Sequence, residues 1–249
     1  MHPFFQGYEF YGFVHRGGDE VKSENTFEAF QHSSDMGFVY METDVQSTKD
    51  GYVVIFHDAN LKRMAGLNKK VKDLTLEEIK SIDLIDGGKI PLLSETLENF
   101  PDLKFNIDIK TEDAVEEAIK IILSMNCLDR TCLASFSSKR LKKIRFLAGS
   151  GVCSSSGQMD IFRMVCRSYG INIKSSDGDC AQIPRKQWGI PILTDRFLKI
   201  AHEENKFVHI WTIDDKTEML ELIDLGVDGL MTDKPSILKQ AMIERGIFN

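Results

Sequence analysis

The sequence predicts a parallel α/β barrel built as one domain. Strand-like and helix-like segments alternate from end to end, which is typical of a parallel sheet with crossover helices. The length of 249 residues matches a single barrel domain. Polar side chains also recur at the carboxyl-terminal ends of apolar, β-type runs, beginning with His15 and Arg16. In a parallel barrel these ends meet at one face, so the pattern predicts a shared pocket and hence an enzyme.

The first half of the chain carries four predicted strands and three predicted helices. The helix over Asn25–Met36 is expected to use its first residue as the N-terminal cap and to end at Gly37. The short helix over Leu74–Ile82 begins after Asp73 or Thr75, because both residue types accept hydrogen bonds from first-turn N–H groups. The strands are Glu9–His15, Val39–Val45, Tyr52–Phe56 and Phe105–Ile109, and the third helix is Ala114–Met125.

The second half continues the alternation. Its predicted strands are Thr131–Ser135, Val152–Ser154, Cys180–Ile183, Phe207–Ile213 and Gly229–Thr232. Its predicted helices are Lys139–Leu147, Met159–Tyr169, Thr194–Glu204, Thr217–Leu225 and Ser236–Glu244. Eight strand positions result if Tyr52–Phe56 is a return arm of the second strand. The single domain therefore spans residues 1–249, with a small insertion at about 59–92 that we expect to cap the barrel mouth.

Composition indicates a cytoplasmic enzyme that acts on small molecules. The formal net charge of −7 argues against nucleic acid or anionic membranes as the main partner, since both select basic surfaces. No run approaches the roughly 20 apolar residues of a membrane span, and the amino terminus lacks the pattern of a signal peptide. The 5 cysteines show no metal-ligand spacing, which favours free thiols in a reducing compartment. We expect no stable membrane association, and the oligomeric state stays open.

Two carboxylates on the second strand are the first candidate metal ligands. Glu42 and Asp44 are two residues apart, so they project from one face about 6.5 Å apart along the strand. Two carboxylates on an inner barrel face would repel each other, and a divalent cation such as Mg²⁺ or Ca²⁺ relieves that repulsion. The alternative is an acidic pair that faces solvent.

A turn signal predicts that a histidine meets these carboxylates. Asp50-Gly51 is typical of a two-residue hairpin turn. An ideal hairpin pairs Lys49 with Tyr52 and places Asp44 directly opposite His57, and cross-strand partners lie on one face within about 5.5 Å. A one-residue bulge would shift this register.

Further polar residues follow the same pattern on other strands. Asp108 and Lys110 form either a local salt bridge or part of the pocket. His209 is expected to lie deeper in its strand than Trp211. Outside the predicted site stand Asp58, which would orient or screen it, Asp233, a candidate cap for the last helix, and Trp188, expected in a loop.

A series of short motifs runs in one order from residue 15 to residue 235. The motifs are His15-Arg16-Gly17, Glu24-Asn25-Thr26, Glu42-Thr43-Asp44-Val45, Thr48-Lys49-Asp50-Gly51, His57-Asp58, Asp73-Leu74-Thr75, Ile90-Pro91-Leu92-Leu93-Ser94-Glu95, Trp211-Thr212-Ile213-Asp214, Gly226-Val227-Asp228-Gly229 and Thr232-Asp233-Lys234-Pro235. Together they closely resemble the glycerophosphodiester phosphodiesterase family. An ordered set of this kind is specific, whereas any one motif would be weak.

The resemblance implies a TIM barrel with a small insertion after the second strand. It also implies metal-dependent cleavage of a glycerophosphodiester into an alcohol and sn-glycerol 3-phosphate. Carried over by residue, the resemblance makes His15 and His57 the general acid and base. The ligands of Mg²⁺ or Ca²⁺ would be Glu42 and Asp44. Arg16 and Lys110 would bind the phosphate, and Trp211 would line the substrate pocket. Asp108 stands where the family more often has glutamate, so this metal contact is shorter by one methylene.

Two other functions stay open at this point. A phospholipase-type barrel would act on membrane lipid, although no exposed aromatic or basic interfacial segment is evident in the sequence. A catalytically silent barrel would only bind phosphate esters, and it would be expected to lack a histidine or the acidic pair. The nucleophile is either water or the glycerol 2-hydroxyl, and either histidine could be the acid.

Overall fold

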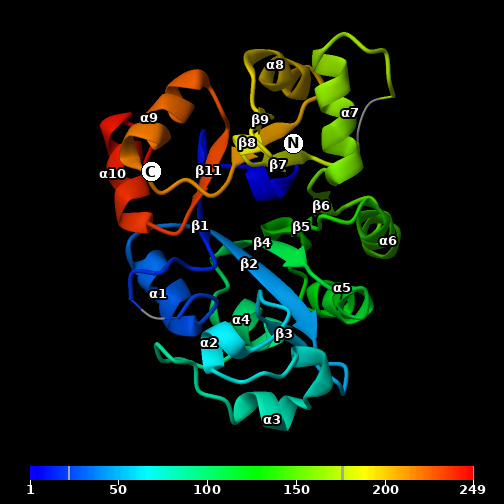
Figure 1. The fold of residues 1–249 in the computed structure, drawn as a ribbon, viewed down its shortest axis with the longest axis vertical. Coiled ribbons are helices and arrows are strands. Elements are labelled where there is room, and N and C mark those ends of the chain that lie inside the picture. The colour runs from blue at the N-terminus through cyan, green and yellow to red at the C-terminus, as the bar shows by residue number, and fades with distance from the viewer. Residues whose placement is uncertain (22, 175–176, 249) are drawn as a thin grey trace.

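Eight parallel strands form a nearly closed barrel, which confirms the predicted fold class (Figure 1). The computed structural model describes residues 1–21, 23–174 and 177–248. The strands, in their order around the sheet, are β6 (Cys153–Ser154), β5 (Thr131–Ala134), β4 (Lys104–Ile109), β2 (Tyr40–Ser47), β1 (Tyr11–His15), β11 (Gly229–Thr232), β10 (Phe207–Ile210) and β7 (Cys180–Ile183). A single bridge between Ser155 and Cys180 links β6 to β7. The ring brings residues from distant parts of the sequence to one rim.

Helices cover the outside of the strands, and those named next match predicted helices except for α4 (Leu93–Asn99), which was not predicted. They are α1 (Phe27–Asp35), α4 (Leu93–Asn99), α5 (Ala114–Ser124), α6 (Ser138–Ala148), α7 (Gln158–Ser168), α8 (Asp195–Glu203), α9 (Lys216–Leu225) and α10 (Pro235–Glu244). Among the described residues, none of the helices is long and apolar enough to cross a membrane. The predicted Asn25 cap is wrong, because Thr26 caps α1 through its hydroxyl while Asn25 has a left-handed backbone with φ of 59°.

The hairpin after β2 has a different register from the ideal two-residue turn. Strand β3 (Val53–Ile55) pairs with β2 so that Val45 faces Ile55. The predicted pairing of Asp44 with His57 is therefore wrong, and the N–H of Phe56 donates to the carbonyl of Asp44 at 2.9 Å instead. The loop is one residue longer because Gly51, with φ of 88°, closes a three-residue turn.

The segment 59–92 packs around its own small apolar cluster beside β2 and β3. It contains α2 (Lys62–Ala65), the 3₁₀ turn η2 (Val71–Asp73) and α3 (Leu76–Lys80). Helices α2, in cyan, and α3, in teal, lie at one end of the molecule (Figure 1). The cluster includes Val54, Leu61 and Ile79, all fully buried. Thr75 begins α3 in a capping box with Glu78, as one of the two predicted caps.

The amino-terminal turn η1 (Pro3–Phe5) closes the end of the barrel opposite the polar strand ends. Phe4 and Phe5 are almost completely buried among aromatic side chains of β1 and β2. The Lys104 ammonium donates to the carbonyls of Pro3 and Phe4 at 3.1 and 2.8 Å. This end of the barrel is therefore closed by side chains, and the open face is the one that carries the polar residues.

A second, two-stranded hairpin stands at this open face and was not predicted. Its strands are β8 (Lys186–Gln187) and β9 (Ile190–Pro191), and Trp188 lies in the turn between them. Strands of two residues are too short to give a periodic pattern in the sequence. The Trp188 side chain is 91% exposed.

Candidate active site

A cavity of about 710 Å³ lies at the carboxyl-terminal ends of the strands. Its wall includes all eight predicted site residues, which are His15, Arg16, Glu42, Asp44, His57, Asp108, Lys110 and Trp211. The predicted grouping arises because parallel strands end at the same rim.

Asp44 is the most strongly paired group in the cavity. Its carboxylate lies 3.1 Å from the Arg16 Nε and 2.7 Å from the Lys110 Nζ, and the Asn25 side-chain amide donates to it at 3.2 Å. Burial alone would raise the pKa of Asp44, but the charges of Lys110 and Arg16 hold it below its ordinary value. Asp44 therefore remains a carboxylate, and Asn25 helps to fix its orientation.

Glu42 and Asp108 have fewer partners than their burial requires. Burial first, and then the negative charge of Asp44, raise the pKa of Glu42 to about 7. Burial also raises the pKa of Asp108, and its Oδ1 is buried without a hydrogen-bond partner. A divalent cation would add positive charge beside these buried carboxylates and a partner for the Asp108 Oδ1, so the residues present fit such an ion.

His15 is held between two carboxylates. Its Nδ1 lies 2.6 Å from the Asp233 Oδ1, and its Nε2 lies 3.7 Å from Glu42. Burial by itself would lower the pKa of His15, but Glu42 and the Asp233 hydrogen bond outweigh it and raise that pKa. The prediction that Asp233 caps α10 is wrong, because the cap position is Lys234 and the Ser236 N–H of the first turn donates to the Glu20 carboxylate instead. The signal for Asp233 was its place at the end of a strand.

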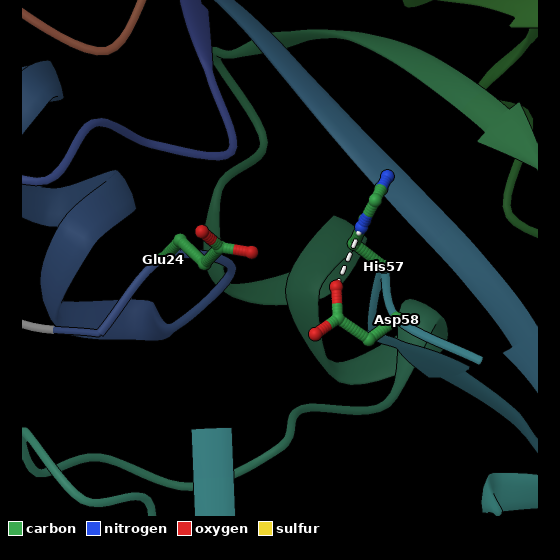
Figure 2. A group of neighbouring side chains, drawn as sticks. All are labelled: Glu24, His57 and Asp58. Carbon is green, nitrogen blue, oxygen red and sulfur yellow. Dashed lines mark hydrogen bonds and ion pairs between the residues drawn. The ribbon is translucent and has the colours of Figure 1, made fainter. Parts of the chain in front are cut away.

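His57 has a matching arrangement on the other side of the cavity. Its Nδ1 lies 2.8 Å from the Asp58 Oδ1, as the dashed line in Figure 2 marks. The Arg63 Nε binds the other oxygen of Asp58 at 2.7 Å, and the Arg63 Nη2 lies 2.6 Å from Glu24. Arg63 first, and His57 to a lesser extent, hold the pKa of Asp58 at about 2. Asp58 thus orients the ring, one of the two roles weighed for it.

Glu24 joins the two histidine sides and was missed as a site residue. Its carboxylate accepts from Arg16 at 2.9 Å and also binds Arg63. Glu24, His57 and Asp58 each place a ligand atom within 4.8 Å of the others, and Figure 2 shows Glu24 facing the pair across a gap. Since Arg63 already binds both carboxylates, this trio is an ion-pair network. In the sequence, Glu24 was signalled only as the first residue of the Glu24-Asn25-Thr26 motif.

The family of this chain follows from comparison with known proteins. The model of the glycerophosphoryl diester phosphodiesterase family matches residues 15–237. This chain belongs to that family. A "probable glycerophosphodiester phosphodiesterase 2" of Mycobacterium tuberculosis is 34% identical, with 94% of this chain and 90% of the relative aligned. A glycerophosphodiester phosphodiesterase of Caldanaerobacter subterraneus is 30% identical over 90% of this chain and 94% of its own.

Solved structures of the glycerophosphodiester phosphodiesterase family have the same fold. A glycerophosphoryl diester phosphodiesterase from Silicibacter pomeroyi aligns with a TM-score of 0.83 at 19% identity, covering 99% of both chains. A phosphodiesterase from Oleispira antarctica, solved with the product sn-glycerol-3-phosphate, aligns with a TM-score of 0.79 at 20% identity, covering 94% of this chain and 96% of that one. These likenesses establish the barrel for this member.

Lys110 connects the charged part of the cavity with an aromatic part. Its ammonium lies 2.7 Å from both Asp44 and Asp108, and 5.7 Å from the centre of the Phe136 ring. Trp211 meets Phe136 edge to face at 5.9 Å. Two carboxylates raise the pKa of Lys110 although burial opposes them, so it stays a cation that can bind a phosphate.

His209 lies below the cavity, as predicted. It is completely buried, and burial lowers its pKa to about 3. Its ring packs 4.8 Å from Phe13. It is therefore a neutral part of the barrel interior, without access to a substrate.

Proposed function

We propose that this cavity hydrolyses glycerophosphodiesters to an alcohol and sn-glycerol 3-phosphate with the help of Mg²⁺ or Ca²⁺. One observation carries the proposal. Two histidines, each held at Nδ1 by a carboxylate, share a cavity with an acidic cluster and two cationic side chains. This is the equipment that cleavage of a phosphodiester monoanion requires.

The charged residues divide into two groups with different tasks. Glu42, Asp44 and Asp108 would hold the divalent cation, which supplies positive charge to a phosphoryl oxygen when bound. Arg16 and Lys110 offer N–H donors to the other phosphate oxygens, and both are already positioned by their bonds to Asp44.

The two imidazoles serve as acid and base. One accepts the proton of the nucleophile, and the other donates a proton to the oxygen of the leaving alcohol. Asp233 and Asp58 bind the Nδ1 positions, so each ring presents its Nε2 to the substrate. Loss of either imidazole leaves one of the two proton transfers without a partner.

We place this activity in the cytoplasm, in the turnover of glycerol-containing phosphodiesters derived from lipids. The free thiols support that compartment, since all five cysteines are unpaired and four of them are buried.

The test is release of glycerol 3-phosphate from glycerophosphocholine and glycerophosphoethanolamine. We expect release that EDTA abolishes and that either Mg²⁺ or Ca²⁺ restores. Release that persists in EDTA would contradict the metal assignment. No release from folded protein under any of these conditions would reject the activity itself.

The histidine roles need a second test. We expect His15→Ala and His57→Ala each to abolish most turnover, by at least about 10²-fold, because each removes a proton transfer partner. Near-normal rates in both purified variants, with unchanged circular dichroism, would overturn the acid–base assignment.

A further inference from the structure

The cavity has two chemically different sides. Strands β1, β2 and β4 and the segment after β3 supply the charged groups described above. The opposite side is formed by α7, the β8–β9 hairpin and the loop after β5, and it is apolar. We call this surface the apolar wall, and it consists of Phe136, Ile161, Phe162, Val165, Trp188 and Ile190.

Several large hydrophobic side chains of the apolar wall are exposed to solvent. Phe162 is 57% exposed, Ile190 is 61% exposed and Trp188 is 91% exposed. On α7, Met164 faces the core and is fully buried, while Phe162 and Val165 line the cavity. Large side chains exposed beside a pocket indicate an apolar ligand, because contact with one removes their surface from water.

Polar partners for a glycerol group lie elsewhere in the cavity. Asn106 and Gln182 line it and are joined by a hydrogen bond of 2.8 Å, and Ser135 also lines it. The glycerol hydroxyls can exchange hydrogen bonds with these amides and this hydroxyl, whereas the apolar wall offers them nothing. The wall is thus the place for the other half of the diester.

The wall also begins next to the phosphate-binding group. The Lys110 ammonium lies over the Phe136 ring at 5.7 Å, and Phe136 touches Trp211. A phosphate bound at Lys110 therefore directs one of its ester groups along the wall. A cavity of about 710 Å³ also exceeds what a glycerol phosphate alone needs.

We propose that the leaving alcohol of the substrate carries an apolar chain, which lies along the apolar wall during hydrolysis. This inference rests on the proposed function and names the substrate class of the same site. Water adds its hydroxyl to phosphorus, the bond from phosphorus to the alcohol oxygen breaks, and that oxygen takes a proton. The products are glycerol 3-phosphate and a long-chain alcohol.

The test is a chain-length series measured below the concentrations at which the substrates form micelles. The first arm uses glycerophosphodiesters of ethanol, butanol, hexanol and octanol, with glycerophosphocholine as the polar reference. Each methylene that the wall buries should raise kcat/KM by about two- to threefold until the wall is covered. The second arm places the chain on the glycerol instead, as 1-hexanoyl and 1-octanoyl glycerophosphocholine.

Substitutions in the apolar wall test whether its residues cause the dependence of kcat/KM on chain length. We expect Phe162→Ser and Trp188→Ala each to reduce the gain in kcat/KM from ethanol to octanol by at least about fivefold. The matched control is Phe146→Ser on α6, a phenylalanine that is 85% exposed and does not line the cavity. This control should keep the full dependence on chain length.

The outcomes separate the inference from the proposed function. A rise along the alcohol series that the wall variants flatten supports the inference. A rise only in the acyl-glycerol series overturns the placement of the chain on the alcohol, and a flat response in both overturns the wall as a binding surface. Folded protein that hydrolyses none of these diesters, glycerophosphocholine included, rejects the proposed function instead.

Discussion

At the scale of single residues, both histidines of the site have a carboxylate partner, but the two partners come from different parts of the sequence. His57 takes its carboxylate partner from the next residue, Asp58, whereas His15 takes Asp233 from 218 positions away. In both, a short contact fixes Nδ1 and so selects which ring nitrogen faces the cavity. A carboxylate in this place also stabilises an imidazolium during proton transfer.

The Asp233 contact leads to a prediction about turnover. Asp233→Asn keeps the size of the side chain but removes one of the two carboxylate charges that raise the pKa of His15, and Glu42 remains. We expect kcat to fall on the order of 10²-fold, because the imidazolium of His15 loses its partner, while KM changes little. Steady-state kinetics on glycerophosphocholine measures this split. A change confined to KM would show that Asp233 acts on substrate binding and not on His15.

At the scale of elements, the segment 59–92 touches the active site through one side chain. None of its residues lines the cavity, yet Arg63 of α2 binds both Asp58 and Glu24. Glu24 in turn binds Arg16. The insertion is therefore coupled to both sides of the site by a chain of ion pairs, although its apolar cluster is separate.

This coupling predicts that removing the Arg63 charge lowers kcat but hardly changes the free energy of unfolding. Arg63→Met should lower kcat by about tenfold, because Asp58 loses the donors that hold it against His57. The change in the free energy of unfolding should stay below about 1 kcal/mol, since Arg63 is half exposed and its ion pairs are screened by solvent. Kinetics and urea unfolding measure the two effects.

The matched control lies in the same insertion. Lys80→Met removes an exposed ion pair with Glu95 at 3.0 Å. Neither Lys80 nor Glu95 is paired with His15 or His57. It should change neither kcat nor stability appreciably. Equal losses in both variants would show that any lost charge in the insertion slows the enzyme.

At the scale of the whole molecule, the barrel floor is a layer of aromatic side chains with one buried imidazole. His209 lies among Phe5, Tyr11 and Phe13, and its Nε2 has no hydrogen-bond partner. The folded protein keeps this ring neutral until about pH 3, whereas the unfolded chain binds a proton near pH 6.5. Stability from this group is complete above pH 6.5 and falls as the pH decreases through this window.

The His209→Leu variant tests this dependence on pH. Between pH 7.5 and pH 5 the wild type should lose about 2 kcal/mol of unfolding free energy through His209, and the variant should be spared that part. Urea unfolding at the two pH values measures the difference. If wild type and variant lose equal stability, His209 does not remain neutral in the folded state.

Local sequence patterns predicted the residues that line the cavity more completely than the residues that hold them in place, such as Asp233 and Arg63. All eight predicted residues line one cavity because strand periodicity and the common rim of parallel strands place them there. The register of the hairpin was predicted one residue out, since a Gly51 turn of three residues obeys the same sequence signal as one of two.

The sequence by itself determined the barrel, the family and the eight predicted residues that line the cavity, because alternation of elements and short motifs are local properties. Tertiary structure alone decided that Asp233 binds His15, that Arg63 ties the insertion to Asp58, and that Phe162 and Trp188 line the same cavity. These contacts join segments far apart in the chain. Their geometry depends on how the barrel closes, which no periodicity within a single segment encodes.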